Sequence, residues 1–212
     1  EGCMDYLLTY YDRGFSGNPY DAGTDRTYSM DSLPQELSCY GNGDFRSASL
    51  MLENGDGSMS CDMRYKNYTI RDGKYSLPGL PAVYADNEEA QTLEIVLEDP
   101  ATGVEAMLLY GVLPELDIIT RSVYVRNQSS EKIYVNKVMS AELDFLYGDY
   151  DLLTFYGRHA MERNLQRVPV AHGSQMIGSV RGTSSHQYNP MMILAEKDTT
   201  EDHGGCYAMS FV

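Results

Sequence analysis

TLEIVLEDPATGVEAMLLY, residues 92–110, contains the pattern that decides the fold class. Apolar residues recur at every second position on both sides of DPATG (99–103), which has the composition of a turn. Side chains two positions apart share one face of a β-strand. The segment therefore predicts two strands joined by a hairpin, with these residues facing the core: Leu93, Ile95, Leu97, Val104, Ala106, Leu108 and Tyr110.

On either side of this hairpin the same two-residue period returns in short segments separated by polar turns. Strands are expected at 47–52, 58–70, 119–125, 133–145, 152–156, 168–180, 190–196 and 206–212, and the segment 133–145 carries the longest alternation. The sequence has no sustained helical period, and strands follow one another through hairpin turns. It thus predicts an all-β fold, a large antiparallel two-sheet β-sandwich, formed by a single domain over residues 1–212.

The charge balance and the cysteines narrow the functional classes. The 212 residues carry a net charge of −15, from 31 acidic and 16 basic side chains, which argues against binding a nucleic-acid backbone and suits a neutral ligand. No apolar run approaches the ~20 residues that cross a bilayer, so no membrane contact is expected. Cys3, Cys39, Cys61 and Cys206 form no C-x-x-C pair, which favours reduced thiols in a cytoplasmic protein. Because the sequence begins at Glu1, a removed secretion signal stays open as an alternative.

The tract Asp12–Arg46 has little apolar periodicity and is rich in Gly, Pro, Asp, Arg and Tyr. Such long irregular runs are usually functional or disordered, and large side chains recur too often here for disorder. We therefore expect an ordered surface excursion anchored by Phe15, Tyr20, Tyr28, Leu33, Leu37, Tyr40 and Phe45. It should present six charged side chains, namely Asp12, Arg13, Asp25, Arg26, Asp44 and Arg46.

Motifs for catalysis or metal binding are weak. The four histidines lack the close spacing of a metal site, and Asp21–Asp25 departs from a calcium loop because Arg26 stands where a glycine should turn the chain. Ser185 and His186 are adjacent, so on a strand they point to opposite faces, and Ser185 is better assigned to a turn. No pair of acids stands out as a glycosidase pair. We expect no metal and no cofactor.

Tyrosine dominates the aromatic residues, with 18 Tyr, 5 Phe and no Trp. A ring that carries a hydroxyl can stack on the C–H face of a sugar and hydrogen-bond its hydroxyls. Tyrosine is also a common strand residue. The composition therefore favours carbohydrate binding only slightly.

Seven motifs spread over nearly the whole chain carry a family resemblance: DRTYSMDSLPQE (25–36), YGNGDFR (40–46), LPGLPAVY (77–84), TLEIVL (92–97), ITRS (119–122), GRHAMERN (157–164) and SVRGTSSHQYNP (179–190). In this order they resemble the N-terminal β-supersandwich domain of family-36 glycoside hydrolases, the bacterial α-galactosidases of the raffinose/melibiose type. The resemblance implies a retaining enzyme whose two catalytic aspartates lie on a barrel downstream of Val212. It also implies missing first strands before Glu1. We expect no catalytic residue in this chain and no activity from it alone.

By motif position, the resemblance implies that Asp12 and Arg26 contact the sugar in the active site of a neighbouring subunit of a homotetramer. His159 stands where many family members carry a substrate-contacting Trp, and this departure replaces a broad ring face with a smaller ring that has nitrogen atoms. The expected substrate-binding residues are thus Asp12, Arg26 and His159. The expected partners are an α-galactoside oligosaccharide and further copies of the chain.

Two other classes of protein stay open on the sequence. One is a free-standing carbohydrate-binding β-sandwich with no enzyme attached. The other is a purely structural assembly domain.

Overall fold

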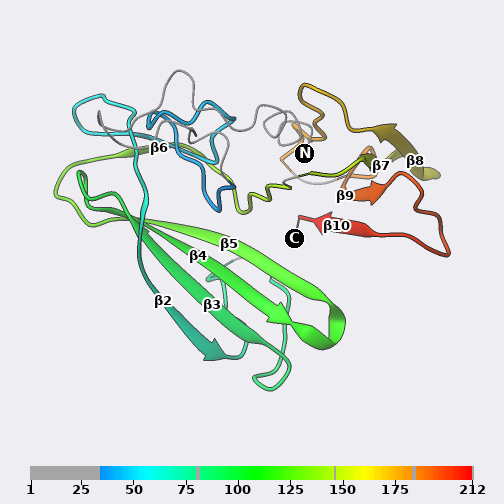
Figure 1. Ribbon diagram of the computed structural model, residues 1–212, viewed down its shortest axis with the longest axis horizontal. Helices are drawn as coiled ribbons and strands as arrows, with labels where there is room; N and C mark the ends of the chain where they lie inside the picture. Colours follow the sequence, from blue (N-terminus) through cyan, green and yellow to red (C-terminus); the bar gives the residue numbers. More distant parts are fainter. Residues whose placement is uncertain (1–33, 80–81, 146, 183–184, 212) are drawn as a thin grey trace. The chain divides into compact units, whose positions relative to one another are not determined.

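The computed structural model describes residues 34–79, 82–145, 147–182 and 185–211. These residues fall into two compact units, one within Tyr11–Asp144 and the other within Phe145–Val212. Each unit contains a four-stranded antiparallel sheet, and the first also contains a two-stranded sheet (Figure 1). We refer to them below as the first and the second unit in chain order.

The large sheet of the first unit is an antiparallel meander of four strands in the order β2 (Arg64–Asp72), β3 (Gln91–Glu98), β4 (Val104–Leu113) and β5 (Ile118–Asn127). A single 3-10 turn, η2 (Pro114–Leu116), joins the last two strands. Leu108 is paired with Ile95 on one side and Val123 on the other, so the apolar faces of three strands coincide. This register places the alternating residues of the segment 92–110 on one face of the sheet.

The core of the first unit lies between this sheet and a smaller one. The small sheet pairs β1 (Leu50–Glu53) with β6 (Tyr134–Val138), and the segment around Cys39 runs beside β1 through a parallel bridge to Leu50. Burying a leucine side chain contributes roughly 1.5–3 kcal/mol, and Leu50 and Leu52 are completely buried. The full buried cluster is Leu37, Cys39, Leu50, Leu52, Cys61, Val104, Ala106 and Leu108.

The second unit contains one sheet, in the order β10 (Cys206–Ser210), β9 (Tyr188–Glu196), β7 (Tyr150–Arg158) and β8 (Met161–Pro169). Arg167 on β8 holds neighbouring segments together. Its guanidinium donates to Asp151 Oδ2 at 2.6 Å and to the carbonyl oxygens of Lys197 at 2.7 Å and Thr199 at 2.8 Å. One planar side chain thus ties β8 to β7 and to the turn between β9 and β10.

The all-β, antiparallel fold class is confirmed, and each of the two large sheets has four strands. Three expected strands are wrong in their extent. The strand expected at 58–70 begins only at Arg64. The alternation at 133–145 predicts one long strand, but only Tyr134–Val138 is extended in a sheet. The segment 168–180 is largely irregular after Pro169, and a bend at Gly173, with φ +112°, turns the chain. The strand that the sequence analysis missed is β8, which is exposed along most of its length and so lacks an apolar alternation.

The described residues contain no helix that is long and apolar enough to span a membrane. Cys39, Cys61 and Cys206 are free thiols, the first two buried and the third exposed. In the ranges that the structure describes, no group of three or more His, Cys, Asp or Glu side chains is arranged to hold a metal ion.

Candidate functional site

His159 is the only one of the three predicted substrate-binding residues that lies within the described ranges, since Asp12 and Arg26 lie outside them. It occupies the tip of the hairpin between β7 and β8. Arg158 and Met161 close this hairpin as a cross-strand pair, so His159 and Ala160 form the two-residue turn. The His159 side chain is therefore exposed at the end of a two-stranded hairpin.

The hairpin tip has an unusual backbone. Ala160 and Arg163 have φ of +63° and +59°, a left-handed conformation that costs an L-residue roughly 1–2 kcal/mol. Glu162 accepts the amide N–H of Ala160 at 2.8 Å, and this contact stabilises the turn. A Cβ at Gly157 would collide with the Met161 carbonyl oxygen and lie 2.8 Å from Glu162 Cα, so glycine is required there. Strained backbone that neighbouring contacts maintain is common at functional sites.

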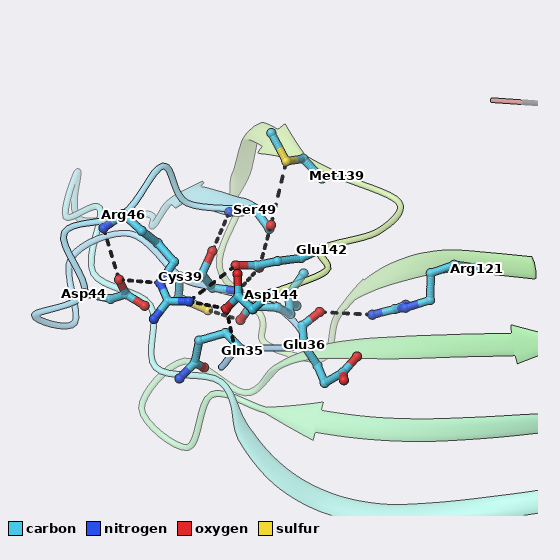
Figure 2. Close-up of polar contacts among 12 residues, drawn as sticks. Gln35, Glu36, Cys39, Asp44, Arg46, Ser49, Arg121, Met139, Glu142 and Asp144 are labelled. Carbon is cyan, nitrogen blue, oxygen red and sulfur yellow. Dashed lines mark hydrogen bonds and ion pairs between the residues drawn. The ribbon is translucent and has the colours of Figure 1, made fainter. Parts of the chain in front are cut away.

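The charged residues at the end of the tract Asp12–Arg46 are buried, which corrects the expectation that they are presented on the surface. The side chains of Asp44 and Arg46 are 1% and 6% exposed. Arg46 Nε donates to Asp44 Oδ1 at 2.9 Å, and Arg46 Nη1 also donates to Asp144 and lies 4.0 Å from Glu142 Oε1. We call Asp44, Arg46, Glu142 and Asp144 the Arg46 cluster; Figure 2 shows the three carboxylates around the guanidinium.

The Arg46 cluster holds the segment 35–49 against the segment that follows β6. Glu142 Oε2 accepts hydrogen bonds from the backbone N–H of Ser38 at 2.6 Å and from the Ser49 hydroxyl at 2.7 Å. Asp144 Oδ2 accepts a hydrogen bond from the backbone N–H of Gln35 at 2.9 Å (Figure 2). These contacts explain why the strand expected over 133–145 ends early, since the two acidic residues turn toward backbone N–H groups of another segment. Buried N–H groups need such acceptors. Asp44 Oδ2 is buried without a hydrogen-bond partner in the described part of the chain.

Of the seven expected anchors of the tract, Leu37 is buried in the core as predicted, whereas Tyr40 and Phe45 are exposed. Phe15, Tyr20, Tyr28 and Leu33 lie outside the described residues. Glu36, next to Leu37, accepts the Tyr110 hydroxyl and lies close to Arg121, whose guanidinium lies 4.3 Å from the centre of the Tyr110 ring. Burial, followed by the hydrogen bond to Glu36, raises the pKa of Tyr110 to about 12.

Cys39 and Cys61 contact each other in the core of the first unit. A hydrogen bond from the Cys61 thiol lowers the pKa of Cys39, and the same contact together with burial raises the pKa of Cys61. Both side chains are almost fully buried. The pair is therefore part of the packing of this unit and is shielded from solvent reagents.

Ser185 belongs to a turn, as predicted. It exchanges backbone hydrogen bonds with Tyr188, at 3.1 and 3.5 Å, and its hydroxyl accepts the amide of Gln187 at 3.3 Å. Glu142 and Asp144 were not predicted as functional residues, because both lie inside an alternating pattern. Two acids two residues apart in an otherwise apolar strand were the available signal.

The antiparallel sheets and the exposed hairpin between β7 and β8 define an all-β domain, and comparison with known proteins specifies its family. The sequence model described as the glycosyl hydrolase family 36 N-terminal domain matches residues 8–212. The chain belongs to this family.

The relatives are α-galactosidases by name. The chain is 60% identical over 209 residues to the bifunctional alpha-galactosidase/sucrose kinase AgaSK of Mediterraneibacter gnavus, covering 99% of this chain and 22% of AgaSK. It is 43% identical over 200 residues to alpha-galactosidase Mel36A of Lactobacillus acidophilus, covering 94% of this chain and 27% of Mel36A. The chain thus spans about a quarter of the length of these relatives.

Solved structures agree with this assignment. The galactosidase domain of AgaSK superposes with a TM-score of 0.88 at 60% identity, over 97% of this chain and 28% of that one. A variant of the family-36 α-galactosidase AgaA from Geobacillus stearothermophilus in complex with stachyose also gives a TM-score of 0.88, at 38% identity, over 94% of this chain and 28% of that one.

Proposed function

We propose that this chain is the non-catalytic N-terminal domain of a retaining α-galactosidase that hydrolyses terminal α-galactosides of oligosaccharides of the raffinose/melibiose class. The observation that carries the proposal is the match to the family along residues 8–212, together with 60% identity to an α-galactosidase over 99% of the chain. Relatives solved with raffinose and with stachyose support the substrate class. In this proposal residues 1–212 act as one domain, the whole protein is a cytoplasmic homotetramer, and the catalytic acids lie elsewhere in the polypeptide.

Within this proposal Asp12, Arg26 and His159 contact the substrate. A carboxylate and a guanidinium can each hydrogen-bond neighbouring sugar hydroxyls. The position of His159 supports its role, because it is exposed at a hairpin tip whose backbone is held in a left-handed turn. An imidazole there can donate or accept one hydrogen bond to a hydroxyl of the sugar.

The experiment is a kinetic comparison in the whole protein, with raffinose and p-nitrophenyl α-galactoside as substrates. His159→Ala removes one hydrogen bond and should lower kcat/KM for raffinose about threefold to tenfold. Asp12→Asn and Arg26→Ala remove charge-assisted bonds and should lower it about tenfold to 100-fold. His203→Ala is the matched control, because His203 is an exposed histidine in the turn between β9 and β10.

Three outcomes separate the alternatives. No hydrolysis by the whole protein contradicts the galactosidase proposal and favours a free-standing carbohydrate-binding module. Hydrolysis that is unchanged in all three variants, in a protein that still assembles, leaves only the role of an assembly domain. Turnover by residues 1–212 alone, lost on replacing one of their own acids, contradicts the assignment of catalysis to another part of the protein.

A further inference from the structure

A groove of 490 Å³ opens in the second unit, against the face of the sheet formed by β7, β8 and β9. The groove is lined by residues of the sheet and by the irregular segment 176–180; the lining residues from the sheet are Thr154, Phe155, Tyr156, Gln166, Tyr188 and Asn189. We call these residues the tyrosine groove.

The two tyrosines lie side by side. Tyr156 on β7 and Tyr188 on β9 are directly opposite each other in the sheet, so their side chains leave it on the same face. The two are 51% and 50% exposed, which leaves about half of each side chain free for contact. Thr154 and Gln166 are likewise opposite each other on β7 and β8, and so they extend the same surface by one strand.

Among the described residues, three side chains of the tyrosine groove have unused hydrogen-bonding groups. In the described part of the chain, the hydroxyls of Tyr156 and Tyr188 and the amide of Gln166 have no hydrogen-bond partner. An amide offers both donors and an acceptor, and each phenol can donate and accept. A ligand with several hydroxyl groups would therefore find partners without displacing an internal bond.

The charge of the tyrosine groove is equally informative. The chain has a net charge of −15, and 22% of its residues are charged, yet none of the residues that line the groove carries a charge. An anionic or cationic ligand would gain no ion pair here. The surface instead matches a neutral ligand that has an apolar face and hydroxyl groups, which describes a pyranose ring.

We propose that the tyrosine groove binds one neutral hexopyranosyl ring of a saccharide, with Tyr156 and Tyr188 against its C–H face and Gln166 on its hydroxyls. The choice of a sugar among neutral ligands rests on the proposed function. The binding itself requires no turnover.

The test uses the whole protein labelled with [¹³C-methyl]methionine, because Met176 lines the groove and its side chain is exposed. The probe is methyl β-D-galactopyranoside, which has the ring but lacks the α-linkage that the proposed enzyme would cleave. Met176→Leu identifies the reporter signal. The probe should shift this signal in a saturable way, and galactitol, which has hydroxyls but no ring, should not.

Tyr156→Ala and Tyr188→Ala should each weaken the probe about tenfold, the loss of one aromatic contact of about 1.4 kcal/mol. Tyr147→Ala is the control, since Tyr147 is an exposed tyrosine of the same unit outside the groove. A Met176 signal that does not move, or moves equally in all three variants, overturns the proposal.

A change of oligomeric state in the Tyr156 and Tyr188 variants without a probe response also overturns it, and assigns the groove to a protein contact instead. Loss of hydrolysis is a separate readout, so failure of the proposed function and failure of this site are distinguishable.

Discussion

Replacing Arg46 by Met should strongly destabilise the first unit. The change removes the cation that the described carboxylates of the Arg46 cluster share, and leaves those of Asp44, Glu142 and Asp144, which are 1%, 10% and 10% exposed. Removing one partner of a buried ion pair costs about 3–5 kcal/mol, because the remaining charge stays buried without compensation. Domains are stable by about 5–15 kcal/mol, so this loss is a large fraction of the total.

The measurement is urea unfolding followed by circular dichroism at pH 7, together with hydrogen exchange of the Ser38 backbone N–H, which donates to Glu142. Arg64→Met is the control, because the Arg64–Asp62 pair spans 2.8 Å but its side chains are 71% and 44% exposed. Exposed pairs of this kind contribute about 0–1 kcal/mol. Arg46→Lys, which keeps the charge but loses the planar fork, should lie between the two.

A second substitution tests whether buried negative charge causes the loss of stability. Asp144→Asn should destabilise the natural sequence, because it weakens the acceptor for Gln35 and Arg46. In the Arg46→Met background the same change removes an uncompensated negative charge and should recover part of the lost stability. If Arg46→Met costs no more than the Arg64 control, or if Asp144→Asn destabilises both backgrounds equally, burial of charge is not what governs this cluster.

Two further predictions concern titration. Hydrogen bonds from Lys66, at 2.8 Å, and from Gln128 lower the pKa of Glu105. The contribution of Glu105 to stability is therefore present above pH 4.5 and lost as the pH falls through its lower folded-state pKa. Lys66→Met should raise the pKa of Glu105 in an NMR titration, and an unchanged pKa would contradict the assignment. The pKa of Tyr110 is raised to about 12, so its contribution to stability is present below pH 10 and lost as the pH rises through about 12. In a pH titration of tyrosinate absorbance, Tyr110→Phe should remove the step that occurs at the highest pH. Retention of that step would show that another tyrosine produces it.

The strands at the centre of the first unit were predictable because side-chain alternation is a local property. Leu93, Ile95 and Leu97 needed only their own sequence to reveal a face, and the turn at 99–103 needed only its Asp, Pro and Gly. The strand β8 could not be found in this way. It lies at the end of its sheet and most of its residues are exposed, so apolar residues do not recur at every second position in its sequence.

The candidate site was likewise predictable from the sequence only in part. The motif around His159 could be read from the sequence, but its place at a hairpin tip and the left-handed backbone at Ala160 and Arg163 are visible only in the structure. The tyrosine groove likewise depends on pairing, since Tyr156 and Tyr188 are far apart in sequence and become neighbours only through the register of β7 and β9.

Alternation of side chains and turn composition act over a few residues, and so the sequence by itself determined the all-β antiparallel class and most strand positions. The tertiary structure decided which charges are buried. Arg46 and Asp144 are 98 residues apart, and no local sequence pattern predicts that they form an ion pair. Whether a charged residue is presented to solvent or neutralised inside the protein depends on partners that only the folded chain brings within hydrogen-bond distance.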